Sequence, residues 1–228
     1  MALYPREDNE QHTAPEQLTS SVAAIFRACG TFETDARTVA GSLVHAGLRG
    51  IHSHGVLRVP DYVRKMTVEG VDPKGQPRVV SETGGTICID GANSMRKVGG
   101  KLARELATER ARETGAAFAA VGGSNHCGIM DYYTLPAAEN DMIGLAGTNT
   151  LPTMAPWSRI GKIVAQFNNS WLTPDFEEVF VPGALEKRVA ERNFTDGIPL
   201  NAEMLEDISI SASRLGVGIN LRCKGETT

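Results

Sequence analysis

The stretch PRVVSETGGTICIDGANS, residues 77–94, decides the fold class together with the two segments that follow it. Its two apolar runs flank the turn-forming pair Gly84-Gly85 and predict two short strands. VGGKLARELATERARETG, residues 98–115, predicts a helix that ends at Gly115, and AAFAAVGG, residues 116–123, predicts a buried strand. A strand, a helix and a strand in this order are typical of an α/β layer with parallel pairing.

The same alternation continues beyond this unit. SNHCGIMDYYTLPAAEND, residues 124–141, is predicted to be helical in its later part, and MIGLAGTNT, residues 142–150, predicts another short strand. None of these predicted strands is followed by the glycine pattern GxGxxG, and the sequence contains no Walker A motif. The layer is therefore predicted to be α/β without a Rossmann dinucleotide fingerprint.

Helical segments are predicted on both sides of this layer. PEQLTSSVAAIFRACG, residues 15–30, has an apolar face and ends at Gly30, and the helix in residues 31–50 is expected to begin at an N-cap, Thr34. Residues 181–197 and 198–217 predict two further helices, the second N-capped by Asn201. The expected organisation is a helical region at 1–75, an α/β region at 76–157, and a joint with a helical tail at 158–228.

Composition narrows the class of protein. With 228 residues, 41% hydrophobic and 22% charged, the chain is typical of a globular protein that can bury a real core. A net charge of -4 and the lack of a long basic run argue against nucleic-acid binding. No apolar run is long enough to span a membrane, the N-terminus lacks signal-peptide features, and the four scattered cysteines are expected to be free thiols. These features together predict a cytoplasmic protein.

The stretch RGIHSHGVLRVPDY, residues 49–62, concentrates groups that transfer protons and bind anions. We favour a helix from Ser53 to about Val68 with a weak point at Pro60, although Pro60 can equally start a fresh helix. On one helix, His54 and Arg58 would share a face. From spacing alone, the simpler interpretation is that Ser53 is an N-cap, His54 a solvated residue and Arg58 a surface charge.

Four stretches together resemble the malate/L-lactate dehydrogenase family: LRGIHSHGVLRVPDYV, the segment from IDGANS to SNHCGIMDYY, AGTNTLPTMAPW, and GIPLNAEMLEDISISASRLGV. This non-Rossmann family also includes ureidoglycolate, sulfolactate and Δ1-piperideine-2-carboxylate enzymes. The resemblance implies a sulfolactate-dehydrogenase-like α/β fold, with helical N- and C-terminal parts packed on an α/β domain. Family members are longer, and the domain is expected to be incomplete because the sequence after MAPW passes directly to later family segments.

The resemblance implies an oxidoreductase that transfers a hydride between NAD or NADP and a small 2-hydroxy or 2-oxo acid. His54 is then the general acid/base, because histidine titrates near neutrality, and Ser53 orients its imidazole or relays the proton. Arg58 is expected to bind the substrate carboxylate with its planar guanidinium. A homodimer is implied as well. The alternative is a catalytically inactive remnant that acts at most as a binding or interaction protein.

The loop after residues 116–123 supplies the remaining candidates. His126 is expected to be a second acid/base or a contact to the nicotinamide. The full set of candidate cofactor-binding residues is His126, Cys127, Gly128, Thr148 and Asn149. Turn geometry explains the glycine equally well, and turn capping explains Thr148 and Asn149. A zinc site formed by His52, His54, His126 and Cys127 is disfavoured because the spacing is irregular.

Overall fold

The structure is a computed structural model that describes residues 10–148 and 183–221. Its α-helices are α1 (Pro15–Ala28), α2 (Glu33–Leu48), α3 (Val59–Thr67), α4 (Arg96–Thr114), α5 (Asp131–Ala138), α7 (Ala184–Asp196) and α8 (Ala202–Arg214). Two short 3-10 helices, η1 (His52–His54) and η2 (Val56–Arg58), precede α3. The strands are β1 (Gln11–Thr13), β2 (Arg78–Thr83), β3 (Thr86–Asp90), β4 (Phe118–Gly122) and β5 (Ile198–Leu200). Within these ranges no helix is both long and apolar enough to cross a membrane.

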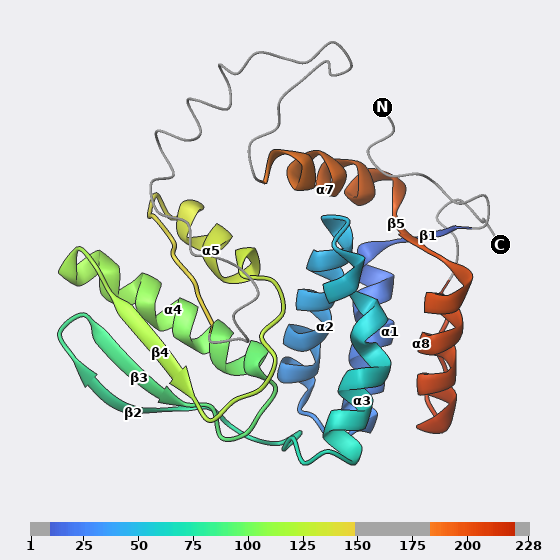
Figure 1. The fold of residues 1–228 in the computed structure, drawn as a ribbon, viewed down its shortest axis with the longest axis horizontal. Helices are drawn as coiled ribbons and strands as arrows, with labels where there is room; N and C mark the ends of the chain where they lie inside the picture. The colour runs from blue at the N-terminus through green and yellow to red at the C-terminus, as the bar shows by residue number, and fades with distance from the viewer. Residues whose placement is uncertain (1–9, 149–182, 222–228) are drawn as a thin grey trace, which may run out of the picture.

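The α/β unit is a three-stranded sheet with α4 on one face, seen in green in Figure 1. β2 and β3 form an antiparallel hairpin around Gly84 and Gly85, and β3 pairs with β4 in parallel. Ile87, Ile89 and Ala103 form its small buried core between β3 and α4. The parallel pairing requires the crossover through α4, as the order strand, helix, strand predicts.

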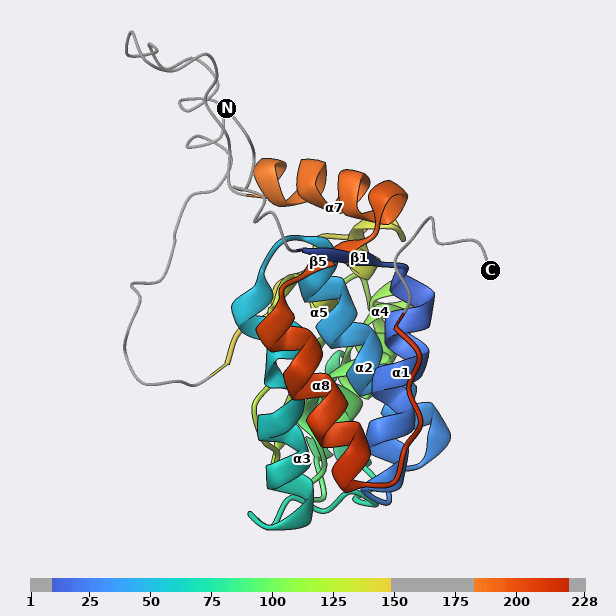
Figure 2. The same cartoon turned by 90° about the vertical axis from the view of Figure 1, so that its right-hand side faces the viewer.

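A helical bundle lies beside this unit and contains the main core. Figure 2 shows α1, α2, α3 and α8 side by side, with α7 crossing one end of the bundle. The apolar faces of these helices meet in one cluster whose large members include Leu18, Phe26, Leu43, Tyr62 and Ile208. Residues from both ends of the chain therefore form one core, and α2 also contacts α4 of the α/β unit.

Besides the shared core, a strand pair and a buried amide connect the C-terminal part of the chain to the N-terminal part. β1 pairs antiparallel with β5, with Gln11 opposite Leu200. Asn193 of α7 is fully buried, and its Nδ2 donates to the carbonyls of Gly47 at 3.3 Å and Leu48 at 3.0 Å. Helix ends leave carbonyls without partners in the helix, so Asn193 satisfies the end of α2 from 145 residues away in the chain.

Several predicted elements are confirmed. α1 ends where expected, with Gly30 at a φ of 97°, and α4 ends at Gly115 with a φ of 80°. Asn201 caps α8, because its side chain accepts a hydrogen bond from the backbone N–H of Met204. Cys29, Cys88 and Cys127 are free thiols as expected, and Cys223 lies outside the described residues. The predicted fold class, non-Rossmann α/β with helical ends, is also confirmed.

Two strand predictions need correction. Residues 142–148 form no strand, and Ile143 and Leu145 are 93% and 86% exposed. A strand needs a neighbouring strand for its backbone and a covering layer for its side chains, and this segment has neither among the described residues. β4 forms as predicted but is not buried, since every residue from Phe118 to Gly122 is half-buried or exposed.

The predicted helix from Ser53 to Val68 is wrong. The chain forms η1, then Gly55 at φ -90° and ψ -149°, then η2, and α3 begins only at Val59. Gly55 interrupts the helical conformation, and Pro60 occupies the first turn of α3, where a proline is tolerated.

Thr34 is not an N-cap, because α2 begins at Glu33 and the residue in the N-cap position is Phe32. The strands β1 and β5 were not expected from the sequence.

The buried amide of Asn193 gives a test of this packing. Asn193→Ala should lower the free energy of unfolding by about 1–3 kcal/mol, because the Leu48 carbonyl loses the donor from Asn193 and the Gly47 carbonyl keeps only the backbone N–H of Gly50. Glu191→Gln on the same helix is the control, since this side chain is 67% exposed and its ion pair with Lys187 spans 4.0 Å. That variant should stay within about 0.5 kcal/mol of wild type. Equal stabilities of the two variants in urea unfolding would contradict the packing role of Asn193.

Candidate functional site

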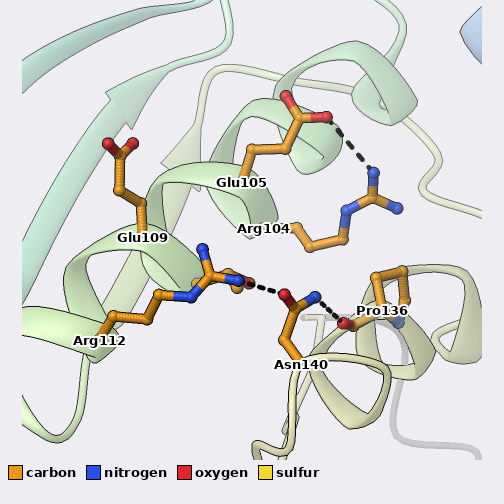
Figure 3. Close-up of a pocket in the computed structure, with 7 residues that line it drawn as sticks. Arg104, Glu105, Glu109, Arg112, Pro136 and Asn140 are labelled. Atoms are coloured by element: carbon orange, nitrogen blue, oxygen red, sulfur yellow. Dashed lines mark hydrogen bonds and ion pairs between the residues drawn. The ribbon is translucent and has the colours of Figure 1, made fainter.

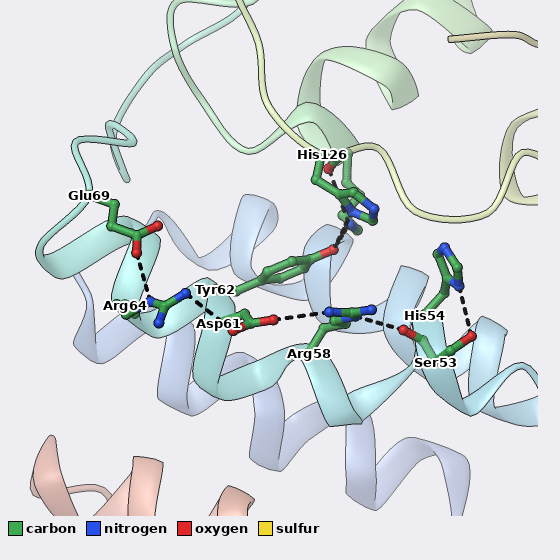
Figure 4. A network of polar contacts seen from close by, with 9 residues as sticks. Ser53, His54, Arg58, Asp61, Tyr62, Arg64, Glu69 and His126 are labelled. Carbon is green, nitrogen blue, oxygen red and sulfur yellow. Dashed lines mark hydrogen bonds and ion pairs between the residues drawn. The ribbon is translucent and has the colours of Figure 1, made fainter. Parts of the chain in front are cut away.

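The turn between α2 and α3 brings three of the predicted residues together (Figure 4). The Oγ of Ser53 lies 3.0 Å from Nδ1 of His54, and the backbone carbonyl of Ser53 accepts a hydrogen bond from Nε of Arg58 at 2.7 Å. Arg58 also donates from Nη1 to Asp61 at 3.1 Å. His54 and Arg58 are thus linked through Ser53 across two 3-10 turns, and they do not share the face of one α-helix as predicted. Ser53 contacts an imidazole and makes no N-cap hydrogen bond.

The loop after β4 places His126 against this turn. The rings of His54 and His126 stack with centroids 5.8 Å apart and an interplanar angle of 27°. Nδ1 of His126 lies 3.1 Å from the hydroxyl of Tyr62, which belongs to α3 (Figure 4). His126 is exposed, whereas Tyr62 is only 1% exposed. Two imidazoles from distant parts of the sequence therefore face each other at an accessible position.

Lys97 lies beneath this pair and is fully buried. Its Nζ donates to the hydroxyl of Tyr62, lies 4.3 Å from the centre of that ring, and is 3.4 Å from the carbonyl of His126. Burial is the main cause that lowers the pKa of Lys97 to about 7; Cys127 opposes this shift, and Lys65 and Arg58 contribute to it. Lys97 is also in the first turn of α4, where the helix dipole disfavours a positive charge.

The site is electropositive, and the two histidines respond to it. Burial, followed by the charge of Lys97, lowers the pKa of His126 to about 4. Burial also lowers the pKa of His54, and Arg58 and Lys97 add to that effect. Burial raises the pKa of the Tyr62 hydroxyl, which keeps it neutral. At neutral pH, both imidazoles are therefore mainly uncharged in a positive field that favours an anion.

The candidate cofactor-binding residues lie in different surroundings. Cys127 is buried, and its carbonyl accepts a hydrogen bond from Tyr133 at 2.7 Å. Gly128 has a φ of 80°, and a Cβ there would lie 3.3 Å from Nζ of Lys97. The hydroxyl of Thr148 accepts a hydrogen bond from Nη1 of Arg96 at 2.7 Å. Asn149 lies outside the described residues. Of this set, His126 is the residue that contacts the Ser53–Arg58 turn through His54.

Sequence reasoning missed Lys97 and Tyr62. A lysine in the first turn of a helix opposes the usual preference for acidic residues there, and this was the available signal. Tyr62 is part of the quoted histidine stretch, but its direction into the core depends on where α3 begins. Neither the burial of Lys97 nor its contact with an element 35 residues away can be read from local patterns.

Two other features of the described residues carry no site. No group of three histidine, cysteine or carboxylate side chains in these ranges converges in a way that could hold a metal ion. Figure 3 shows a hollow between α4 and α5 in which several of the polar groups bond to one another. Arg112 donates to Asn140, and Arg104 pairs with Glu105 at 3.5 Å.

Comparison with known proteins identifies the family. The family model for malate/L-lactate dehydrogenase matches residues 13–159, which is more than half of the chain. This chain belongs to the malate/L-lactate dehydrogenase family, as the sequence motifs predict.

Curated relatives extend the match in sequence. A malate dehydrogenase of Pyrococcus abyssi is 38% identical over 158 residues, which is 69% of this chain and 44% of the relative. An L-sulfolactate dehydrogenase of Methanocaldococcus jannaschii is 37% identical over 150 residues, covering 66% of this chain and 44% of the relative. The match therefore covers less than half of the length of each of these relatives.

Solved structures show the same fold. The malate dehydrogenase of Pyrococcus horikoshii superimposes with a TM-score of 0.84 at 21% identity, covering 95% of this chain and 99% of that chain. A Δ1-piperideine-2-carboxylate reductase from Pseudomonas syringae is 30% identical with a TM-score of 0.54, covering 57% of this chain and 39% of that chain.

The buried amine predicts how stability depends on pH. Because folding lowers the pKa of Lys97 to about 7, the folded state binds fewer protons than the unfolded state between pH 7 and the ordinary lysine pKa of about 10.4. The free energy of unfolding should therefore rise by more than about 1 kcal/mol across this window. Lys97→Met should remove this rise, as measured by urea unfolding at several pH values.

Lys101→Met is the matched control for that measurement. Lys101 is on the same helix, its side chain is 42% exposed, and its ion pair with Glu105 spans 3.9 Å. This variant should retain the wild-type slope. If Lys97→Met and wild type show the same pH dependence, Lys97 has an ordinary pKa in the folded protein.

Proposed function

We propose that this chain forms the acid/base and substrate-binding part of an NAD- or NADP-dependent oxidoreductase that acts on a small 2-hydroxy or 2-oxo acid. The observation that carries the proposal is the linkage of His54 and Arg58 through Ser53, with His126 stacked on His54. One end of such an acid needs a proton-transfer group and the other needs a cation, and the turn supplies both within six residues. The names of the relatives, which are malate and sulfolactate dehydrogenases, support this substrate class.

His54 is the proposed general acid/base. When a 2-oxo acid is reduced, the carbonyl oxygen gains a proton, and in the reverse direction the hydroxyl loses it. The nicotinamide cofactor supplies or accepts the hydride in this reaction. The hydroxyl of Ser53 at 3.0 Å from Nδ1 fixes the ring of His54, so that Nε2 is the nitrogen left for the substrate.

Arg58 is the proposed partner of the substrate carboxylate. Its bonds to Ser53 and Asp61 engage two of the five N–H groups of a guanidinium. These bonds hold the side chain in place, and the remaining donors can receive a carboxylate. Lys97 and Lys65 add to the positive field at the histidines and would favour binding of the anion.

The described residues support cofactor binding less well than they support acid/base chemistry. Three of the candidate residues are used in internal contacts: Cys127 is buried, Gly128 packs on Lys97, and Thr148 accepts from Arg96. His126 is exposed and has one ring face against His54. We propose His126 as the residue that lies at the boundary between substrate and cofactor.

A second proposal is a catalytically inactive family remnant that binds a partner or a small acid. The exposed segment 142–148, where a strand was expected, favours it. Phe118 of β4 is 66% exposed, which suits a homodimer in which a second copy covers this edge. A cytoplasmic location is proposed for either function. Turnover of a 2-oxo acid with excess NADH or NADPH, which weak cofactor binding still allows, separates the enzyme from the remnant.

The first kinetic prediction concerns His54. In protein that reduces a 2-oxo acid with NADH or NADPH, His54→Ala should lower the rate by about 10²-fold or more, the usual scale of acid/base catalysis. His12→Ala is the control, because this histidine lies on β1 opposite Pro199. Turnover of His54→Ala at the wild-type rate would remove His54 from the mechanism.

The second kinetic prediction concerns Arg58. Arg58→Lys should raise KM for the carboxylate substrate about tenfold or more, since a single ammonium replaces a planar, bidentate donor. Arg64→Lys in the following helix, α3, is the control, because Arg64 is a mainly exposed arginine that pairs with Asp61 and Glu69. If KM and kcat stay unchanged in Arg58→Lys, the guanidinium does not bind the substrate.

Another prediction concerns cofactor binding and association of the isolated chain. We expect weak or no binding of NADH and NADPH by calorimetry, because the described cofactor candidates are largely used in internal contacts. Light scattering should show an oligomer or aggregation, because apolar residues at β4 and in 142–148 are exposed. A stable monomer that binds either cofactor at micromolar concentration would contradict this expectation.

A further inference from the structure

We propose that Lys97, Tyr62 and His126 form a proton relay that runs from a buried amine to the accessible imidazole of the site. Lys97 is the reservoir at the inner end, the Tyr62 hydroxyl is the bridge, and His126 is the outlet. The role of the outlet toward a 2-oxo acid rests on the proposed function. The relay itself concerns groups of this chain alone.

The contacts form one continuous chain. Nζ of Lys97 is hydrogen-bonded to the hydroxyl of Tyr62, and this hydroxyl lies 3.1 Å from Nδ1 of His126. Exposure changes along the chain from 0% at Lys97 and 1% at Tyr62 to an exposed imidazole at His126. The ring of His126 then stacks on His54 at 5.8 Å. The relay thus connects a position without solvent access to the place where the substrate is proposed to bind.

The hydroxyl of Tyr62 has one proton, and this fixes the direction of the bonds. When Lys97 is an ammonium it can only donate, so Tyr62 accepts from it and donates to Nδ1 of His126. His126 then holds its proton on Nε2. When Lys97 is a neutral amine it can accept, so Tyr62 donates to Lys97 and accepts from Nδ1–H of His126, which leaves Nε2 without a proton.

Movement between these two arrangements transfers one proton without forming a charged intermediate at Tyr62. In the direction of reduction, Nε2 of His126 gives up its proton at the accessible end of the relay, and this proton replaces the one that His54 gives to the substrate oxygen. His126 takes a proton at Nδ1 from Tyr62, and Tyr62 takes one from the ammonium of Lys97, which becomes an amine. The oxidation of a 2-hydroxy acid reverses each transfer. The O–H and N–H bonds that form equal those that break.

The electrostatics suit Lys97 as the reservoir. His54 and His126 have lowered pKa values and hold few extra protons at neutral pH, whereas the pKa of Lys97 is about 7. Further titratable or charged groups in the electrostatic surroundings of these three residues are Arg58, Asp61, Lys65, Cys127 and Tyr133. The raised pKa of Tyr62 keeps the bridge neutral, so it exchanges protons without becoming a phenolate.

The packing leaves room for the amine. Gly128 follows the loop of His126 at a φ of 80°, and a Cβ there would lie 3.3 Å from Nζ and 3.4 Å from Cε of Lys97. A buried amine costs free energy that an apolar side chain of similar length would not. The contacts of Lys97 are therefore poorly explained by stability, and they are consistent with a chemical role.

The test is a titration of the full chain by NMR, without substrate or cofactor. Protein labelled at the histidine ring nitrogens and at the lysine Cε and Nζ is titrated from pH 5.5 to pH 9. His126→Gln and Lys97→Met assign the two signals. We expect Lys97 to titrate near pH 7 and the neutral ring of His126 to move from the Nε2–H to the Nδ1–H form in the same window.

Two variants separate a relay from simple proximity. Tyr62→Phe keeps the ring and removes the bridge, so Lys97 should still titrate while the tautomer of His126 no longer follows it. Lys101→Met should behave as wild type. The relay is wrong if the wild-type tautomer stays constant while Lys97 titrates, or if Lys97 titrates near 10 like an exposed lysine. Coupled titration in a protein without dehydrogenase activity would support the relay and contradict the proposed function instead.

Discussion

The hydrogen bond between Lys97 and Tyr62 joins the two parts of the molecule where the candidate site is built. Lys97 begins the helix that covers the sheet, and Tyr62 belongs to the bundle core. A buried amine must have a polar partner, so the first turn of α4 and the middle of α3 are held in one arrangement. The loop that carries His126 follows β4 and closes over this contact. His126 thus takes its position from contacts with both Tyr62 and Lys97, and His54 stacks on His126.

Local signals in the sequence predicted the elements whose ends are set locally. Gly115 ends α4, Asn201 caps α8, and the pair Gly84-Gly85 turns the hairpin, because each depends on a backbone conformation or cap within a few residues. The strand expected at 142–150 does not form at 142–148, the part of it that the structure describes, for the opposite reason. A short apolar run becomes a strand only beside another strand, and sequence pattern carries no information on whether that neighbour exists.

The residues of the candidate site could be predicted in part from the sequence, but the contacts between them could not. His54, Arg58 and His126 could be singled out by residue type and by family resemblance. The connection of His54 to Arg58 through Ser53 depends on Gly55, which interrupts the helix. The local sequence pattern did not reveal this interruption. Lys97 could not be found in this way, because its importance follows from complete burial against a residue of another element. Such tertiary contacts determine the electrostatics of the site.

The cap that Asn193 places on α2 also has a consequence for how the molecule is made. Asn193 lies 146 residues after Gly47, and β5 pairs with β1 from nearly opposite ends of the chain. Closing such long loops costs entropy before the contacts form, so we expect folding to be slow. On the ribosome, α1 and α2 emerge long before α7, β5 and α8 exist. The nascent chain therefore exposes the apolar faces of its first helices until α7, β5 and α8 have been synthesised, and we expect chaperones to bind it during that interval.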